Sequence, residues 1–303
     1  MEPVYLKSYR NGILKERAIS LKDRLKCCTL CPRNCQVDRF SGETGICKTG
    51  EYAVVSSYAP HFGEESPLVG RHGSGTIFFT NCNLLCNFCQ NYDISHQSSG
   101  SKVTDRILAD MMLSLQSLGC HNINFVTPSH VIPQILSALL IAVDDDLNVP
   151  LVYNSSGYDA VAALQMLDGI IDIYMPDFKF WNSELSKLTC NAPDYAEITR
   201  NALKEMHRQV GDLVLDQSGI AIRGLLVRHL VMPENLAGTE QIMEFIAENI
   251  SKNTYVNIMP QYRPCGKAYE NPLLNRPITQ YEFSIAISMA KKAGITRLDK
   301  IQV

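Results

Sequence analysis

Residues 75–90, GTIFFTNCNLLCNFCQ, join a short apolar strand to three closely spaced cysteines. The run TIFFT at 76–80 is rich in the β-branched and aromatic residues that favour strands. Cys82, Cys86 and Cys89 follow it in a C-x3-C-x2-C pattern. From this stretch onward, short apolar runs alternate with helical patterns. This alternation predicts a parallel sheet covered by helices.

Five further strand candidates follow the first one along the chain. They are INFVT (123–127), LVYN (151–154), IDIYM (171–175), LLVRHLVM (225–232) and TYVNIM (254–259). Helical patterns lie at residues 12–26, 104–119, 130–143, 157–167, 194–211, 238–251 and 278–293. Six units are fewer than a closed barrel has, so we expect a partial (β/α)6 TIM-type barrel, with a doubly wound sheet as the alternative. Either fold places functional residues just after the strands.

The residues before the first strand have a different character. Residues 27–74 are rich in Cys, Gly, Pro and Ser and show little periodicity, which predicts an irregular module stapled by a metal. We therefore expect two parts, residues 1–74 with an N-terminal helix and the Cys-rich metal-binding module, and residues 75–303 with the barrel.

Composition excludes several classes of protein. The net charge of −3 gives no basic field for nucleic acid. No apolar run reaches the roughly 18–20 residues that span a bilayer, and the polar N-terminus has no signal-peptide core. We therefore expect a cytoplasmic protein that contacts neither nucleic acid nor membrane. Most of the 11 cysteines fall between Cys27 and Cys89, which in a reducing compartment indicates metal ligands and not disulfides.

The cysteine triplet suits an iron–sulfur cluster. Three thiolates from one loop can hold three corners of a 4Fe–4S cube and leave the fourth iron open to chelate a substrate. Spacing alone also allows a structural zinc with a fourth ligand from elsewhere. The pattern, with Phe88 just before its last cysteine, resembles the signature of the radical SAM superfamily. The longer string NCNLLCNFCQNYDIS is similar to the pyruvate formate-lyase activating enzyme branch and its activase-like relatives, over about residues 28–265.

This resemblance implies a fold, two cofactors and partners. The open iron would bind S-adenosylmethionine, and one electron would cleave its sulfonium to a 5′-deoxyadenosyl radical that abstracts hydrogen. A low-potential donor such as flavodoxin or ferredoxin would supply the electron, and a glycyl radical enzyme would be the partner. Residues expected near S-adenosylmethionine are Phe88, Thr127, Ser129, Asn154, Asp177, Lys179, Arg228 and Gln261.

Most of these residues follow predicted strands. Related enzymes often carry Gly-Gly-Glu after the second strand, where this chain has Thr127-Pro128-Ser129-His130. Asn154 lies in a polar stretch suited to ribose or methionine recognition, and Asp177 and Lys179 share one side of an extended strand. Arg228 is a charge within an apolar run and suits a carboxylate. Simpler interpretations are a helix start, a β–α turn and a surface ion pair.

A second group, Cys28, Cys31, Cys35 and Cys47, forms C-x2-C-x3-C-x11-C, with Cys27 as an extra candidate. Four ligands close a site, so this one would hold structural zinc or an auxiliary iron–sulfur cluster. Similar Cys-Pro-Arg-x-Cys segments precede the barrel in the activase-like relatives. We interpret Cys120 and Cys190 as structural, and Cys265, His61 and His72 as incidental.

Three functions remain open at this point. The first is activation of a glycyl radical enzyme. The second is radical modification of a small molecule or of a peptide or protein residue, which the additional cysteines and the altered Thr127–His130 segment favour. The third is a zinc-stapled binding protein without catalysis, which leaves the polar strand ends unexplained.

Overall fold

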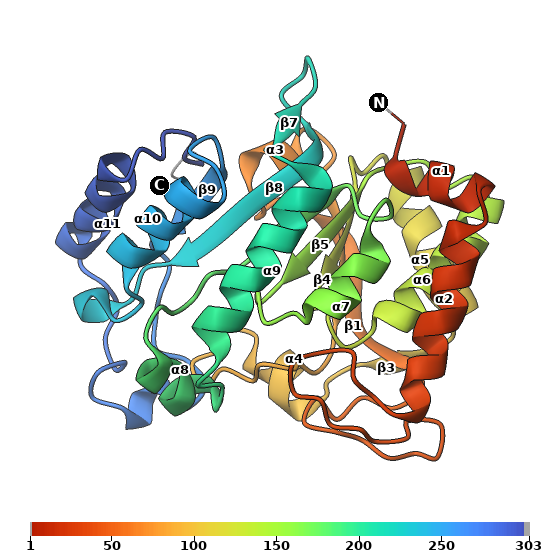
Figure 1. The fold of residues 1–303 in the computed structure, drawn as a ribbon, viewed down its shortest axis with the longest axis horizontal. Helices are drawn as coiled ribbons and strands as arrows, with labels where there is room; N and C mark the ends of the chain where they lie inside the picture. Colours follow the sequence, from red (N-terminus) through yellow and green to blue (C-terminus); the bar gives the residue numbers. More distant parts are fainter. Residues whose placement is uncertain (1, 300–303) are drawn as a thin grey trace.

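The computed structural model describes residues 2–299, which form an α/β fold around a mixed sheet of nine strands (Figure 1). Six parallel strands follow one another in chain order across the sheet. They are β2 (Ser74–Phe79), β4 (Ile123–Val126), β5 (Leu151–Ser155), β6 (Ile173–Pro176), β8 (Ala221–Leu230) and β9 (Tyr255–Met259). The sheet is therefore mostly parallel. Within the described residues β9 does not pair with β2, so the sheet is not closed.

Three antiparallel strands extend this run. β1 (Ala53–His61) pairs with β2 on one side and with β3 (Ser101–Val103) on the other. The short β7 (Val214–Leu215) pairs with the beginning of β8. No reversal of strand order occurs along the parallel run, whereas a doubly wound sheet has one at its switch point.

Helices fill the connections between strands. They are α1 (Val4–Arg10), α2 (Ile13–Asp23), α3 (Ser66–Val69), α4 (Tyr92–Gln97), α5 (Asp105–Ser117), α6 (Ile132–Asp144), α7 (Val161–Leu164), α8 (Ser183–Cys190), α9 (Tyr195–Val210), α10 (Thr239–Asn249) and α11 (Gln280–Lys292). The hydroxyl of Thr104 accepts a hydrogen bond from Ile107 N and starts α5, and Gly119 follows its end at φ 83°.

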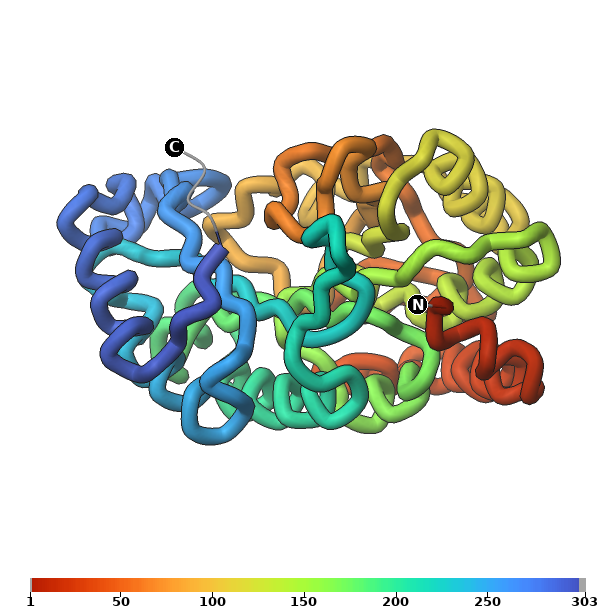
Figure 2. The backbone as a smooth tube through the Cα atoms, turned by 90° about the horizontal axis from the view of Figure 1, so that it is seen from above, coloured from red at the N-terminus to blue at the C-terminus, as the bar shows by residue number. Residues whose placement is uncertain are grey.

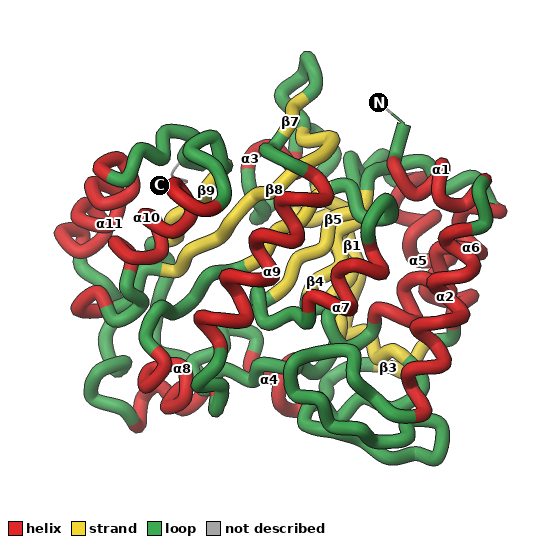
Figure 3. Tube along the Cα trace, viewed as in Figure 1, coloured by secondary structure: helices red, strands yellow, loops and turns green. Residues whose placement is uncertain are grey.

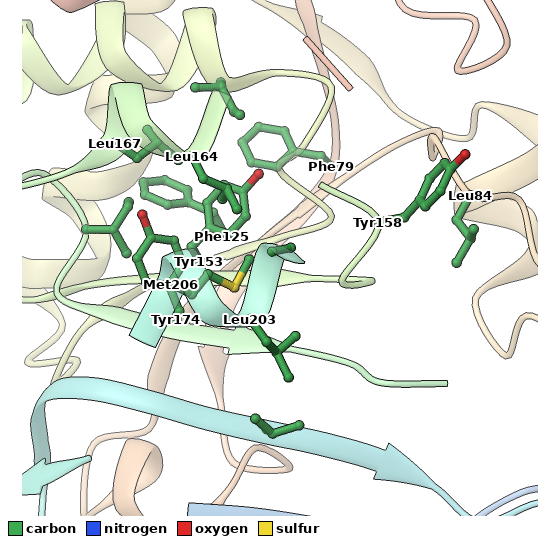
Figure 4. Close-up of a cluster of buried hydrophobic side chains, with 14 of the residues drawn as sticks. Phe79, Leu84, Phe125, Tyr153, Tyr158, Leu164, Leu167, Tyr174, Leu203 and Met206 are labelled. Carbon is green, nitrogen blue, oxygen red and sulfur yellow. The ribbon is translucent and has the colours of Figure 1, made fainter. Parts of the chain in front are cut away.

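The main core lies between the sheet and the helices on its outer face. Figure 4 shows aromatic side chains of β2, β4, β5 and β6 meeting leucines of α7 and α9. Phe79 and Phe125 stack with ring centroids 6.3 Å apart, and both are fully buried. Burial of each such side chain stabilises the fold by roughly 1.5–3 kcal/mol. Figure 2 shows α1 and α2 at one end of the molecule and α10 and α11 at the other.

A second, smaller core lies on the other face of the strands, where Leu68 of α3 packs against Val152, Ile173 and Leu226. The backbone carbonyl of Leu68 accepts a hydrogen bond from Asn122, the residue before β4. The segment between β1 and β2 therefore covers the amino ends of the parallel strands. In Figure 1 α3 lies beside β7, and α4 and α8 lie at the opposite end.

The six predicted strands and seven predicted helical regions are confirmed, although α7 is shorter than residues 157–167 and continues as a 3-10 turn. The expectation of irregular chain is correct for residues 27–52, which contain no helix or strand (Figure 3). It is wrong for residues 53–61, because β1 lies there and pairs with β2. The boundary at residue 74 stays a prediction. Within residues 2–299 no helix is long and apolar enough to cross a bilayer.

Candidate functional site

A cavity of about 400 Å³ lies at the carboxyl ends of the parallel strands. It collects most of the residues that the sequence predicted to act together. These are Cys82, Cys86, Phe88, Cys89, Thr127, Asn154, Asp177, Lys179, Arg228 and Gln261. Ser129 does not line it. Six strands and the loop after β2 therefore contribute to one space.

The loop after β2 turns through left-handed backbone at two places. Asn81 has φ 70° and Leu85 has φ 57°. Asn adopts this conformation readily, but for leucine it is unfavourable by roughly 1–2 kcal/mol. The amide of Leu84 donates to Cys82 Sγ at 3.3 Å, and Cys89 N donates to Cys86 O at 3.1 Å. These bends let three cysteines within eight residues face the same cavity.

Arg33 fastens this loop to the Cys-rich module. Its guanidinium donates to the carbonyls of Asn83 at 2.8 Å, Cys190 at 2.7 Å and Asn191 at 2.6 Å. It also lies 5.2 Å from the ring centre of Tyr158. Arg33 belongs to the Cys-Pro-Arg-x-Cys segment, but nothing in the sequence indicated which carbonyls it would bind. It joins three segments that are distant in the chain.

Cys190 is closer to the triplet than the sequence indicated. It ends α8, is 4% exposed, and its Sγ donates to Cys86 Sγ at 3.3 Å. Neither spacing nor a motif pointed to this contact, because more than a hundred residues separate the two thiols. Cys190 is thus a neighbour of the candidate ligands, whereas Cys120 donates to the carbonyl of His72 away from them.

Cys86 is buried, whereas Cys82 and Cys89 are partly exposed, and the pKa of each thiol is raised. Burial raises the pKa of Cys82 to about 12, and burial also raises the pKa of Cys89. A hydrogen bond with Cys190, together with burial, raises the pKa of Cys86. A bound metal ion is what converts such thiols to thiolates. Among the described residues, no three His, Cys, Asp or Glu side chains converge on one metal position.

The ends of β6 and β8 bring opposite charges to the cavity. Lys179 Nζ lies 2.5 Å from Asp177 Oδ2, and both side chains are 17% exposed. Burial is the largest single influence and would lower the pKa of Lys179, but the surrounding groups, Asp177 first and then Cys86 and Tyr195, together raise it. Asp177 and Lys179 therefore share one side, as predicted, and form a shielded ion pair beside Cys86.

Arg228 also has internal partners. Its Nε lies 3.0 Å from Glu65 Oε1, and Nη1 lies 3.7 Å from Glu64 Oε2. Nη1 also donates to Asn154 Oδ1 at 3.4 Å. Neither glutamate was predicted from the sequence, because both stand in the Gly-rich stretch FGEESPLVG, which has no helix or strand periodicity. The position of His61 in the lining of the cavity was not predicted either.

Residues within β5 and just after it form a buried polar network. Tyr153 and Ser155 both donate to the carboxylate of Asp159, at 2.9 and 2.6 Å. Gly157 has φ 76°, and a Cβ there would lie 2.2 Å from the carbonyl of Asp177. Only glycine allows the ends of β5 and β6 to approach this closely. The network fixes the strand end that presents Asn154, Ser155 and Ser156 to the cavity.

The segment Thr127–His130, which follows β4, reaches the cavity through Thr127. This residue has φ 62°, a conformation that is rare for β-branched side chains and unfavourable by roughly 1–3 kcal/mol. Its amide donates to Asn154 O at 2.9 Å. Ser129 is buried beside Asp159 instead. Of the two predicted hydroxyls, one is therefore placed to meet a ligand.

The second cysteine group gathers in the Cys-rich module. Burial, followed by the neighbouring thiols of Cys47, Cys28 and Cys35, raises the pKa of Cys31 to about 12. A Cβ on Gly45 would lie 2.5 Å from Cys35 Sγ, so glycine makes room for that sulfur. The donor set of four soft thiols suits zinc or an iron–sulfur cluster.

Arg39 connects this group to the main sheet. It is 2% exposed, lies 3.6 Å from Cys47 Sγ, and donates to the carbonyl of His130 at 2.8 Å. His130 in turn lies 3.0 Å from the carbonyl of Thr80, between the strands. The module is thus anchored to the segment that follows β4.

Comparison with known proteins places the chain beside an archaeal relative. No family model matches the chain. It is 35% identical over 281 residues to the uncharacterized protein MJ0674 of Methanocaldococcus jannaschii, and the match covers 90% of this chain and 77% of that protein. This chain belongs to the same family as the archaeal protein. Because the match covers 90% of this chain, the relationship extends over most of the fold.

Proposed function

We propose that the protein is a radical SAM enzyme with a 4Fe–4S cluster on Cys82, Cys86 and Cys89. The observation that carries the proposal is one cavity that holds three closely spaced thiols beside polar residues from six strand ends. A non-catalytic zinc protein would need neither the ion pair at Asp177 and Lys179 nor the strained backbone of Thr127. Sites that store backbone strain are characteristic of function.

The finer fold assignment is part of this proposal. Six parallel strands in chain order, with helices in their connections, support an open (β/α)6 barrel. The cavity at the carboxyl ends of the strands agrees with where such folds place their active sites.

The cluster and S-adenosylmethionine would together supply a 5′-deoxyadenosyl radical for hydrogen abstraction. The chain would then position the cofactor. Lys179 offers a buried ammonium to a carboxylate, while Asn154 and Ser155 offer hydrogen bonds to hydroxyl or amino groups. Phe88 lies edge-on to Phe180 at 5.7 Å and gives the cysteine loop an apolar support that excludes water.

Gln261 and the second cysteine group also have roles in the proposed enzyme. The side chain of Gln90 donates to the carbonyl of Gln261 at 2.9 Å, which ties the cysteine loop to the end of β9. Cys28, Cys31, Cys35 and Cys47 would hold zinc or an auxiliary cluster that staples residues 27–52. A cytoplasmic location and a flavodoxin or ferredoxin donor stay predictions within the proposal.

S-adenosylmethionine cleavage tests the core of the proposal. Anaerobically purified protein should be brown and should form 5′-deoxyadenosine with dithionite and S-adenosylmethionine. Cys82→Ala, Cys86→Ala and Cys89→Ala should each abolish this product, whereas Cys120→Ala, a buried thiol outside the cavity, should retain it. Product formation by all three triplet variants would show that the assignment is wrong.

Two substrate classes remain within the proposal. Activation of a glycyl radical enzyme predicts a glycine-centred doublet in the EPR spectrum after the protein is mixed with such a partner. Modification of a small molecule or of a peptide residue predicts instead an altered product detectable by mass spectrometry. The replacement of Gly-Gly-Glu and the additional Cys-rich module favour testing the second class alongside the first.

A further inference from the structure

The end of the cavity opposite the cysteine loop is formed by residues 61–65, between β1 and α3. His61, Gly63 and Glu64 line this end, which we call the cavity floor. His61 pairs with Ser74, the first residue of β2, so the floor lies near the amino ends of the strands. The cysteine loop follows the carboxyl end of β2. One cavity therefore joins the candidate cluster to a polar floor.

The two glutamates beside the floor have different surroundings. Glu65 has a guanidinium and an amide as partners, because its Oε1 lies 3.0 Å from Arg228 Nε and accepts from Asn257 Nδ2 at 2.7 Å. Glu64 is 6% exposed, and its buried Oε2 has no hydrogen-bond partner. The closest cationic atom to that oxygen is Arg228 Nη1 at 3.7 Å, beyond hydrogen-bond range. Of the two glutamates, Glu64 is the one that lines the cavity.

A buried carboxylate oxygen without a donor is unfavourable by about 1–3 kcal/mol or more. Oε2 of Glu65 is likewise buried without a hydrogen-bond partner, but Glu65 does not line the cavity, so Glu64 is the glutamate that a ligand in the cavity can reach. His61 Nδ1 lies 3.5 Å from the other oxygen of Glu64, and the imidazole is 44% exposed, so solvent screens its charge. The floor thus has a hydrogen-bond acceptor and a negative charge for which a ligand could compensate.

The charges of the floor indicate the kind of ligand. The two carboxylates of Glu64 and Glu65 face the guanidinium of Arg228 and the imidazole of His61, and Oε2 of Glu64 is the cavity acceptor that neither group reaches within hydrogen-bond range. Asp177 and Lys179 neutralise each other nearer the cysteines. A volume of about 400 Å³ is at the lower end of the range that encloses a small-molecule ligand. A buried carboxylate with an unpaired acceptor oxygen therefore favours a ligand that carries a cationic hydrogen-bond donor.

We propose that the cavity floor is the substrate subsite and that Glu64 binds the primary ammonium group of a small-molecule substrate. This inference rests on the proposed radical function and deepens it, because it names the class of molecule. Glu64 acts as a specificity-determining residue: its carboxylate accepts hydrogen bonds from the ammonium group. The rest of the molecule then extends toward the cysteine end of the same cavity.

Binding of simple probes tests the inference without the reaction. The probes are n-butylammonium, n-butanol and butyrate, which share a chain and differ in charge, added to the anaerobically purified full chain and followed by ligand-observed NMR. Wild type should bind butylammonium in preference to the other two. Glu64→Gln removes the carboxylate and with it one charge-assisted hydrogen bond. The affinity for butylammonium should therefore fall at least about tenfold. Glu248→Gln, the same change on the exposed face of α10, should bind as wild type does.

Two outcomes would overturn the inference. One is equal binding of butyrate and butylammonium by wild type. The other is a Glu64→Gln variant that binds butylammonium normally but binds S-adenosylmethionine more weakly, which would make Glu64 a cofactor contact. If Glu64→Gln does not fold, as judged by circular dichroism, Glu64→Asp keeps the charge and should retain the preference for butylammonium over butanol. Loss of that preference in folded Glu64→Asp would equally contradict the inference.

The failure of this inference can be distinguished from failure of the proposed function. Wild type that forms 5′-deoxyadenosine but shows no preference for the ammonium probe would refute the subsite alone. Wild type that prefers the ammonium probe but forms no 5′-deoxyadenosine would refute the radical chemistry alone.

Discussion

At the residue scale, Cys86 has two possible partners, a metal ion and the thiol of Cys190. The two sulfur atoms are 3.3 Å apart and both are buried, so a disulfide needs only a small movement of the side chains. When a metal holds Cys86 as a thiolate, that sulfur is no longer available to form a disulfide with Cys190.

We therefore predict that metal-free protein forms a Cys86–Cys190 disulfide when treated with diamide. Two thiols are oxidised, two protons and two electrons pass to the diazene, and a hydrazine is released. Peptide mapping by mass spectrometry without reductant should find the cross-linked pair in wild type and not in Cys190→Ser. Metal-loaded protein should be protected. A disulfide between Cys86 and Cys82 or Cys89 in its place would contradict the prediction.

The buried histidine of β8 gives a second prediction at this scale. His229 Nδ1 lies 2.8 Å from Phe178 O, and Nε2 lies 2.9 Å from Thr239 Oγ1, so both nitrogens have partners in the neutral form. His229 is therefore a satisfied structural histidine. Burial lowers the pKa of His229 to about 4.

Because the unfolded chain takes up a proton on this histidine near pH 6.5 and the folded chain does not, acid favours unfolding. The stability that His229 contributes should be fully present above about pH 6.5 and should be lost as the pH falls toward about 4. The difference in unfolding free energy between wild type and His229→Gln should shrink by up to about 1.4 kcal/mol per pH unit. Urea unfolding at several pH values measures it. A pH-independent difference would rule this account out.

At the element scale, the strands that were predictable are those buried on both faces. β2, β4, β5, β6, β8 and β9 read as continuous apolar runs because helices and the inner core cover them. β1 was missed because its outer half, SSYAPH, is polar and partly exposed, as suits an edge region. α3, α4 and α8 have too few turns to establish a helical period.

The short α3 nevertheless supports the inner core. Leu68 is fully buried against residues of β5, β6 and β8. We predict that Leu68→Ala lowers the free energy of unfolding by about 3 kcal/mol, because truncation leaves a cavity that the strands cannot fill. The same substitution at Leu188, which is 57% exposed, should change it by less than about 0.5 kcal/mol. Equal effects in urea unfolding would show that α3 is not part of the cooperative fold.

At the scale of the whole molecule, the sequence predicted the strand-end residues that line the cavity but not the residues that form the cavity floor. Residues at strand ends were predictable because parallel strands bring their carboxyl ends to one edge. Glu64, Glu65 and His61 were not, because they come from a connection that returns to the amino ends, and no local pattern records that path. Cys190 and Arg33 were missed for the same reason, since their contacts span more than a hundred residues.

Arg33 holds distant parts of the molecule together and gives a prediction at this scale. Each hydrogen bond from a charged group to a buried carbonyl stabilises by about 1.5–3 kcal/mol. Arg33→Ala should therefore lower the free energy of unfolding by roughly 3 kcal/mol and should increase proteolysis within residues 27–52. Arg10→Ala, which breaks an exposed ion pair with Glu2, should have an effect below about 1 kcal/mol. Unchanged proteolysis in Arg33→Ala would count against this role.

The floor of the cavity is formed by the connection between β1 and β2. These two strands pair through their own backbone hydrogen bonds, which do not depend on the sequence of the connection. The opposite end of the cavity is formed by residues that follow several different strands. A substitution there therefore affects the packing of residues from the other strands. Selection could thus exchange the floor, residues 61–65, and leave the reactive end intact. Under the proposed function, relatives would share one chemistry and diverge in what they act on, and transplanting this connection between relatives would transfer their substrate preference.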